Sequence, residues 1–335
     1  MQRVTPSPSR RTRRRIAIGG LGLAVAFNAL AFRHAWSFTH PGPDTAPRID
    51  PHHLSAADGI RIALFGVPLA KPRNTRTPLA VGLPFQRHII PGDGTRPPLE
   101  AWFVPGADAA TVVLLFHGHG GTKSELLRHA RRFHAMGPAL LLVDFPGSGG
   151  SGDAAFTIGA RESEDVGAAT SYARALTGAR HVYLYGLSMG AVAILKSAAR
   201  GTTADGIILE CPFDSLLTTV EHRFETVGLP AFPAAHALLF WGGLQLGFNP
   251  FRHGALTYAS SVDAPVLLMA GARDPWVTPA ETRHIFEALR GPKQLYLCPG
   301  VGHASCLSSN PDRWTALVGA FVANPVADGG SSALQ

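Results

Sequence analysis

The residues best suited to nucleophilic chemistry lie in the pentapeptide Gly186-Leu187-Ser188-Met189-Gly190. An apolar run, residues 181–185, precedes it, and a run of helical character, residues 191–199, follows it. A G-x-S-x-G sequence between a strand and a helix is typical of a nucleophile elbow, whose strained turn presents the serine hydroxyl above the carboxyl end of a strand. The two glycines remove side chains that would collide there. Ser188 is therefore the candidate nucleophile, and the rest of the chain has to supply its partners.

An activated serine needs a base, a carboxylate that orients the base, and backbone N–H donors for the oxyanion. Downstream of Ser188, one strand-like run leads to Asp274 and the next leads to His303. Upstream, residues 111–116 run into His117-Gly118-His119-Gly120-Gly121, where glycines allow main-chain N–H groups to face a ligand. Asp274 is thus the candidate acid and His303 the candidate base.

Six blocks along the chain resemble those of a known family. Besides the three glycine-containing stretches around residues 117–121, 186–190 and 302–303, they are 144–149, 210–214 and 271–274. From about residue 85 to residue 322 the chain resembles an α/β-hydrolase of the membrane-anchored, serine aminopeptidase-like or esterase-like branch. The order serine, acid, histidine is that of this fold. The resemblance implies a Ser188, Asp274 and His303 triad with oxyanion donors from the backbone N–H groups of His119 and Met189. Residues 146–152 are richer in glycine than the family's loop.

Short apolar runs alternate with helical patterns, which predicts a mostly parallel sheet flanked by helices. The expected strands are 85–90, 99–104, 111–116, 139–144, 181–185, 206–210, 266–270 and 294–297, the first two forming an antiparallel pair. The expected helices are 124–135, 161–176, 189–199, 279–289 and 311–322, and residues 54–68 also show helical spacing.

The alternation breaks once, between residues 212 and 261, where two helical patterns and no strand are expected. In the resembled fold, an insert after the sixth strand forms a cap over the nucleophile. The second pattern, residues 234–248, is strongly apolar, and we expect Leu238, Phe240, Trp241 and Leu244 to bind an apolar acyl or alcohol group. Two alternatives remain open: these side chains pack the cap onto the sheet, or they contact a bilayer.

The net charge of +7 is concentrated near the amino terminus, where six arginines lie within residues 3–15. The remainder is close to neutral, and no nucleic-acid-binding motif is present. Residues 16–32 are apolar except for Asn28, which predicts a signal anchor in the inner membrane with the catalytic domain outside the cytoplasm. A cleaved secretory peptide, with a site at Ala29-Leu30-Ala31, is the first alternative, and an anchored form with its domain in the cytoplasm or a core helix are the others.

The three cysteines are too few for a disulfide framework. Cys298 and Cys306 flank His303 and either form a bridge or are small buried residues. No histidine and cysteine spacing resembles a zinc site, so neither a metal nor another cofactor is expected.

These observations predict a membrane-anchored serine hydrolase that cleaves ester or thioester bonds of an apolar acyl substrate through an acyl-enzyme. A peptidase of the same fold is the first alternative. A non-catalytic binding protein is the second, although such a protein is expected to have lost a triad residue. The expected domains are an arm and anchor (1–36), a tether and lead-in (37–84), a hydrolase domain (85–325) with its cap (212–261), and a disordered tail (326–335).

Overall fold

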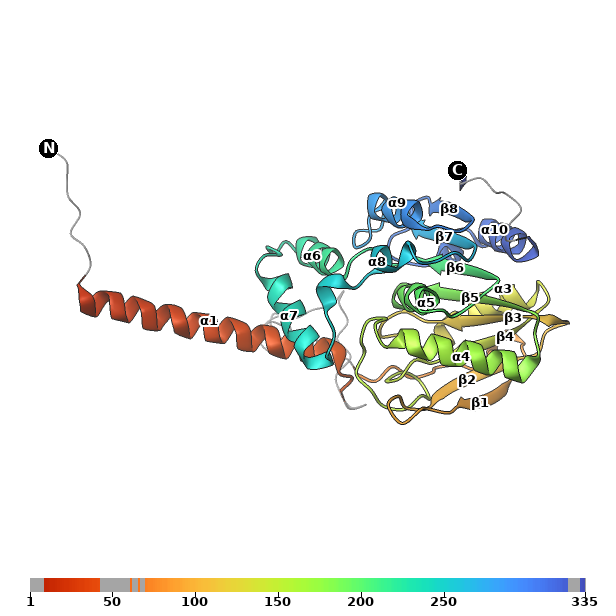
Figure 1. The fold of residues 1–335 in the computed structure, drawn as a ribbon, viewed down its shortest axis with the longest axis horizontal. Coiled ribbons are helices and arrows are strands. Elements are labelled where there is room, and N and C mark those ends of the chain that lie inside the picture. Colours follow the sequence, from red (N-terminus) through yellow and green to blue (C-terminus); the bar gives the residue numbers. More distant parts are fainter. Residues whose placement is uncertain (1–8, 43–60, 62–65, 67–69, 325–331, 335) are drawn as a thin grey trace.

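The computed structural model describes residues 9–42, 61, 66, 70–324 and 332–334 of the chain (Figure 1). Its centre is a nine-stranded sheet in the order β1-β2-β4-β3-β5-β6-β7-β8-β9. The strands are β1 (Gln86–Ile90), β2 (Leu99–Val104), β3 (Asp108–Phe116), β4 (Pro138–Val143), β5 (His181–Leu187), β6 (Gly206–Glu210), β7 (Val266–Gly271), β8 (Lys293–Cys298) and β9 (Ser332–Leu334). Strand β2 pairs antiparallel with β1 and β4, and all other pairings are parallel. The predicted mostly parallel sheet is confirmed.

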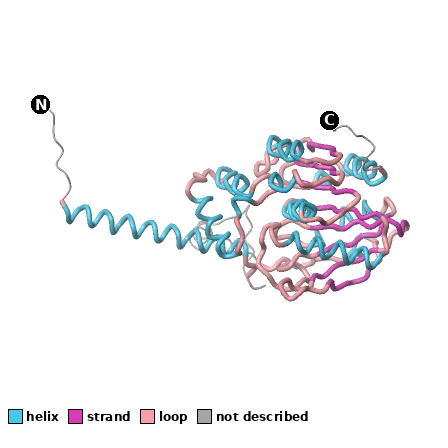
Figure 2. The backbone as a smooth tube through the Cα atoms, in the orientation of Figure 1, coloured by secondary structure: helices cyan, strands magenta, loops and turns pink. Residues whose placement is uncertain are grey.

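Helices cover both faces of this sheet (Figure 2). They are α3 (Leu127–His134), α4 (Glu162–Thr177), α5 (Met189–Ala199), α8 (Ala255–Ala259), α9 (Pro279–Ala288) and α10 (Pro311–Ala323). Alternate residues of β3 enter two separate cores: Val112 and Leu114 pack with α4 and α5, whereas Val113 and Leu115 pack with α3 and α10. Because both faces of the sheet are buried, its central strands are continuous apolar runs in the sequence. The predicted bounds of the strands from β1 to β8 agree with the structure to within three residues.

A helical cap lies between β6 and β7, where the sequence predicts it. Its main helices are α6 (Leu216–Thr226) and α7 (Ala234–Leu246), followed by a short 3₁₀ turn (Pro250–Arg252) and α8. The side chain of Ser215 begins α6 by accepting a hydrogen bond from the N–H of Leu217. Gly247, in the left-handed conformation, ends α7.

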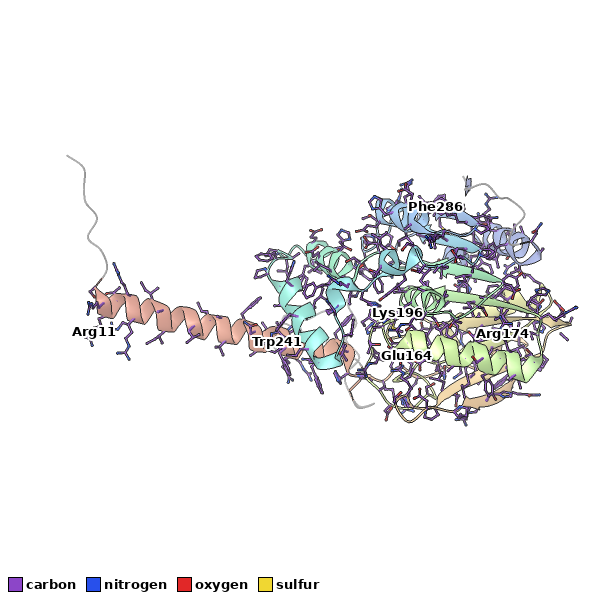
Figure 3. All side chains as sticks on the ribbon, in the orientation of Figure 1. Arg11, Glu164, Arg174, Lys196, Trp241 and Phe286 are labelled. Carbon is purple, nitrogen blue, oxygen red and sulfur yellow. A yellow bond between two sulfur atoms is a disulfide. The ribbon has the colours of Figure 1, made fainter. Side chains whose placement is uncertain are left out.

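The amino-terminal helix α1 (Arg10–Thr39) projects from the body of the protein (Figure 1). Among the described residues it is the one helix long and apolar enough to cross a membrane, and almost all of that stretch is exposed. Helix α1 extends beyond the expected anchor, which ended at residue 36, into the first residues of the expected tether, and it crosses α7. There Trp241 Nε1 donates to Asn28 Oδ1 at 3.1 Å, and Gln245 Nε2 donates to the carbonyl oxygen of Phe32 at 2.8 Å. Figure 3 places Trp241 at this junction.

Three further expectations concern the ends of the hydrolase domain. Residues 332–334 were expected in a disordered tail, but they form β9, whose backbone pairs with the edge that β8 would otherwise leave open. Cys298 and Cys306 form a disulfide, with Cα atoms 5.8 Å apart. The helical spacing over residues 54–68 falls outside the described residues, except at positions 61 and 66.

Candidate active site

Ser188 occupies a strained turn between β5 and α5. Its φ is +50°, a value that L-residues rarely adopt. The turn is tight because a Cβ on Gly190 would lie 2.6 Å from the carbonyl oxygen of Phe116, and a Cβ on Gly186 would lie 2.6 Å from the carbonyl carbon of Gly190. The Ser188 N–H is held by the carbonyl oxygen of Glu210, at 2.8 Å, on the neighbouring strand. The predicted elbow geometry is therefore present.

The structure brings the three predicted catalytic side chains into one chain of hydrogen bonds. Ser188 Oγ lies 3.0 Å from His303 Nε2, and His303 Nδ1 lies 2.7 Å from Asp274 Oδ2. Asp274 follows β7 and His303 follows β8, and parallel strands bring both loops to the same edge of the sheet as the elbow. With Nδ1–H donating to the carboxylate, Nε2 is free to accept the proton of the serine hydroxyl.

The carboxylate of Asp274 is fixed from its other side. The backbone N–H groups of Trp276 and Val277 donate to its Oδ1 at 2.9 and 3.0 Å. The side chain is fully buried, so the acid has one orientation and one acceptor oxygen left for His303. The ring of Trp276 lies against the imidazole of His303, with centroids 5.1 Å apart.

The predicted oxyanion donors lie beside the serine. A Cβ on Gly118 would be 3.7 Å from the Cβ of Ser188, which places the glycine-rich turn next to the elbow. Met189 is the first residue of α5, where helix N–H groups have no partner within the helix. Within the described part of the chain, neither the N–H of Met189 nor that of His119 donates to another protein group.

The two histidines of the glycine-rich turn act as supports. His117 donates from Nδ1 to the carbonyl oxygen of Gly118 at 2.8 Å and accepts at Nε2 from the N–H of Phe145 at 3.0 Å. This bonding requires the neutral ring, and burial lowers the pKa of His117. Burial, reinforced by the nearby Arg223 cation, lowers the pKa of His119 to about 4. Neither ring is therefore suited to act as a second base.

Close packing explains why residues 147–152 are unusually rich in glycine. Under this loop Lys123, fully buried, pairs with Glu100 at 2.8 Å and with Asp144. Burial acts to raise the pKa of Asp144, but the attraction of Lys123 outweighs it and holds this pKa below its usual range. A Cβ on Gly150 would lie 2.2 Å from the carboxyl carbon of Glu100. The loop thus seals a buried ion pair whose partners, Lys123 and Glu100, were not predicted as a pair.

The four predicted substrate-binding residues of α7 do not share one surface. Leu238 lines an apolar cavity of about 130 Å³ between α1, α6 and α7. Phe240 and Leu244 lie on the outer side of the cap and are more than half exposed, and Trp241 packs on Phe32 of α1. Successive residues of a helix point in different directions, so at most one or two of four closely spaced residues reach a given cavity.

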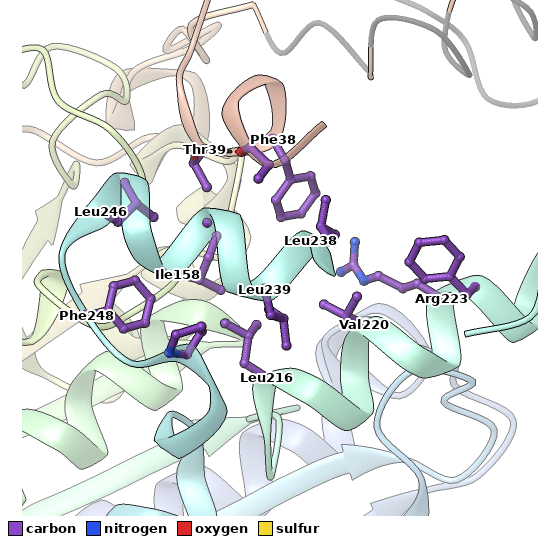
Figure 4. Close-up of a pocket in the computed structure, with 15 residues that line it drawn as sticks. Phe38, Thr39, Ile158, Leu216, Val220, Arg223, Leu238, Leu239, Leu246 and Phe248 are labelled. Atoms are coloured by element: carbon purple, nitrogen blue, oxygen red, sulfur yellow. Dashed lines mark hydrogen bonds between the residues drawn. The ribbon is translucent and has the colours of Figure 1, made fainter. Parts of the chain in front are cut away.

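The cavity itself has walls that the sequence did not reveal (Figure 4). Four segments supply most of its lining: helix α1, the loop before α4, helix α6 and helix α7. The residues are, in that order, Ala35, Phe38 and Thr39; Ile158; Leu216, Val220, Arg223 and Phe224; and Leu238, Leu239 and Leu246. Two contacts connect the cavity to residues that neighbour the triad. The ring of Phe38 stacks on His119 with centroids 4.5 Å apart, and the guanidinium of Arg223 lies 4.3 Å from the ring centre of Trp276.

One buried thiol also lies beside the triad. Ligand atoms of Cys211, Asp274 and His303 lie within 4.8 Å of one another. Burial raises the pKa of the Cys211 thiol well above its usual range, which opposes the thiolate that a metal ion needs. Both ring nitrogens of His303 are engaged with Ser188 and Asp274. The donor set therefore suits proton transfer better than metal binding.

Comparisons with known proteins agree with this architecture. The family model described as serine aminopeptidase, S33, matches residues 107–234. The uncharacterised protein YqkD of Bacillus subtilis (strain 168) is 25% identical over 230 residues, which are 68% of this chain and 75% of that protein. The esterase Pf2001 of Pyrococcus furiosus superposes with a TM-score of 0.64 at 21% identity, over 75% of this chain and 96% of the esterase. A membrane phospholipase A described as a bacterial virulence factor superposes with a TM-score of 0.50 at 21% identity, over 73% and 87% of the two chains.

Proposed function

We propose that this chain, which has the fold of the α/β-hydrolases, is a serine hydrolase that cleaves carboxylic ester or thioester bonds through an acyl-enzyme. The observation that carries the proposal is the hydrogen-bonded chain from Ser188 through His303 to Asp274, set beside two unpartnered backbone N–H groups. The triad and its order are those of a nucleophilic serine with its base and orienting acid.

The proposed reaction begins when His303 Nε2 accepts the hydroxyl proton and Ser188 Oγ attacks the carbonyl carbon of the substrate. The oxyanion is stabilised by the N–H groups of His119 and Met189. His303 then gives its proton to the leaving group, and the acyl group remains on Ser188. Water, deprotonated by His303, releases the acid and restores the enzyme. Asp274 keeps the imidazole in the required tautomer throughout.

The cavity beside the triad favours an apolar acyl group. It is lined by aliphatic and aromatic side chains, and among the described residues around it Arg223 is the one charged side chain. Phe38 connects the cavity to His119 of the glycine-rich turn, and Arg223 connects it to Trp276, whose ring lies against His303. A substrate carbonyl above Ser188 can therefore direct its acyl chain toward α1 and the cap.

The side chains that line the cavity favour an ester substrate over a peptide substrate. An aminopeptidase must bind the substrate's ammonium group, for which a carboxylate is the usual partner. Within the described lining of the cavity, Arg223 is present and no Asp or Glu is. A cation at this position repels an ammonium group and attracts a carboxylate. A peptidase remains the second candidate because residues 107–234 match the serine aminopeptidase model.

We further propose that α1 is retained as a single-pass inner-membrane anchor, with the hydrolase domain outside the cytoplasm. The arginines that precede residue 16 favour a cytoplasmic amino terminus. Phe27, Leu30 and Ala31 line one apolar hollow together with Phe224 and Leu238 of the cap, so cleavage after Ala31 would open this apolar cap surface to solvent. A reporter fused after Gln335 is expected to be active only outside the cytoplasm.

A matched pair of substrates tests the proposed reaction. Wild type, Ser188→Ala and Asp274→Asn are assayed on a decanoyl ester and on the amide of the same acyl group and leaving group. The proposal expects faster turnover of the ester than of the amide, and loss of ester turnover in both variants. Turnover of the amide faster than that of the ester would favour the peptidase.

A further inference from the structure

The cap carries a concentration of exposed apolar side chains. Those with large exposed surfaces are Val227, Leu229, Phe232, Phe240, Leu244 and Phe251, and we call this set the cap apolar face. Phe232, in the turn between α6 and α7, is 72% exposed. Soluble proteins seldom gather so many large apolar side chains on one exposed element, so this surface requires a partner.

The part of the cap that carries five of these six residues lacks charge. Residues 226–250 contain no Asp, Glu, Lys or Arg. This stretch includes the whole of α7 and the turn before it. A cap helix that faced water on its outer side would be expected to carry charged residues there. Exposure without charge is the pattern of a surface that contacts hydrocarbon.

The length of α1 identifies the partner. Its apolar stretch, residues 16–32, is about 25 Å long at a rise of about 1.5 Å per residue, slightly shorter than the hydrocarbon core of a bilayer, about 30 Å. Contact with the cap begins at Phe27, which lines a hollow with Phe224 and Ala234. Only residues 16–26, about 16 Å of helix, are clear of the cap. If α1 spans the bilayer, the cap beside residues 27–32 must lie within it.

We propose that the cap apolar face is inserted in the outer leaflet of the membrane that α1 spans. Figure 1 shows the α6–α7 turn on the side of the cap from which the free length of α1 leaves. The turn, with Val227, Leu229 and Phe232, penetrates deepest, and Phe240 and Leu244 contact lipid along α7. Trp241, bonded to Asn28, holds the two helices together at this depth.

Insertion also gives the apolar cavity a lipid-facing entrance. The hollow that contains Phe27 and Leu30 shares two wall residues, Phe224 and Leu238, with the cavity beside the triad. An acyl chain in the outer leaflet would thus meet apolar side chains from the bilayer to the cavity. This consequence rests on the proposed hydrolase function, whereas the insertion itself does not.

Photo-crosslinking in native membranes tests the insertion without using activity. Benzoylphenylalanine replaces Phe232, Phe240 or, as a matched control, Leu176 of the full-length chain. Leu176 is a partly exposed apolar residue near the end of α4. It lies two residues after Arg174, and Figure 3 shows Arg174 far from the free length of α1. After irradiation, peptides carrying a phospholipid adduct are quantified by mass spectrometry. Adducts at positions 232 and 240 are expected to exceed those at position 176 at least tenfold.

Thiol labelling provides a second measurement if the benzoyl variants accumulate poorly. Phe232→Cys, Phe240→Cys and Leu176→Cys are exposed in intact membranes to a charged maleimide that does not enter bilayers. The native cysteines give little background, because Cys211 is buried and the other two are bonded to each other. Positions 232 and 240 are expected to react only after detergent is added. Equal lipid adducts or equal labelling at all three positions would overturn the proposal, and so would crosslinks at 232 and 240 to a second copy of the chain.

Discussion

His119 Nε2 lies 3.3 Å from the carbonyl oxygen of Phe38, and the two rings stack with centroids 4.5 Å apart. The last turn of the amino-terminal helix therefore touches the turn that carries a proposed oxyanion donor. Phe38 also lines the apolar cavity. One residue of α1 thus contacts both the proposed catalytic centre and the proposed acyl site, so α1 is part of the proposed site as well as the proposed anchor.

Phe38→Ala is expected to lower kcat several-fold while membrane association stays unchanged. The loss of a stacked aromatic pair costs about 0.5–1.5 kcal/mol, which corresponds to at most about tenfold in rate if the His119 turn moves accordingly. Kinetics with an acetyl ester, whose acyl group is too short to fill the cavity, separate the effect on the turn from the effect on acyl binding. Trp36→Ala is the matched control, since Trp36 is on the same turn of α1 but is half exposed. Equal rates for Phe38→Ala and wild type would contradict a role for this contact.

Filling the cavity is expected to shorten the preferred acyl chain. Val220→Phe adds a ring inside it, and each methylene of substrate that no longer fits loses about 0.8 kcal/mol of burial, about fourfold in kcat/KM. Activity on acetyl esters should change little. Leu244→Phe, at an exposed position outside this cavity, serves as the control. A uniform loss across chain lengths in Val220→Phe would indicate that the cavity does not bind the acyl group.

The disulfide brackets the loop that carries His303. Cys298 and Cys306 are eight residues apart, and closing a loop of this size stabilises a protein by about 2–3 kcal/mol in the chain-entropy model. Replacing both with serine should lower the melting temperature and reduce kcat more than KM, because the base becomes less firmly placed. Non-reducing peptide mass spectrometry of the full-length protein should find the bond, which the proposed extracytoplasmic location would preserve. Fully free thiols would contradict the bond and weaken the case for that location.

A buried histidine predicts how stability depends on pH. Burial, with a smaller effect of Arg128, lowers the pKa of His129 to about 3. The unfolded chain therefore binds a proton at this residue from about pH 6.5 downward, while the folded chain does not. Its contribution to stability is present above about pH 6.5 and is lost progressively as the pH falls. The melting temperature of wild type should fall more steeply between pH 6.5 and 4 than that of His129→Asn, and parallel curves would show that His129 does not titrate as proposed.

The fold was predictable because its strands are short apolar runs between glycine, proline and polar turns, and because the elbow and the Asp274 and His303 loops each follow such a run. The three side chains meet because each follows the carboxyl end of a strand, and the parallel strands bring these ends to one edge of the sheet. The cap surface was not predictable in the same way. Helix α7 is apolar on all sides, so its sequence does not reveal which residues face the cavity and which face outward. The contact of Phe38 with His119 joins distant segments and has no local sequence signal.

The most direct measurement of the central claim is the site of covalent modification by a fluorophosphonate. The reagent phosphonylates a serine only when a base and an oxyanion hole activate it, and a peptide mass spectrum locates the adduct. The account predicts one adduct, on Ser188, whose formation is lost in Ser188→Ala and slowed by several orders of magnitude in His303→Ala. Absence of any adduct in folded wild-type protein, or an adduct at another serine that persists in Ser188→Ala, would contradict it.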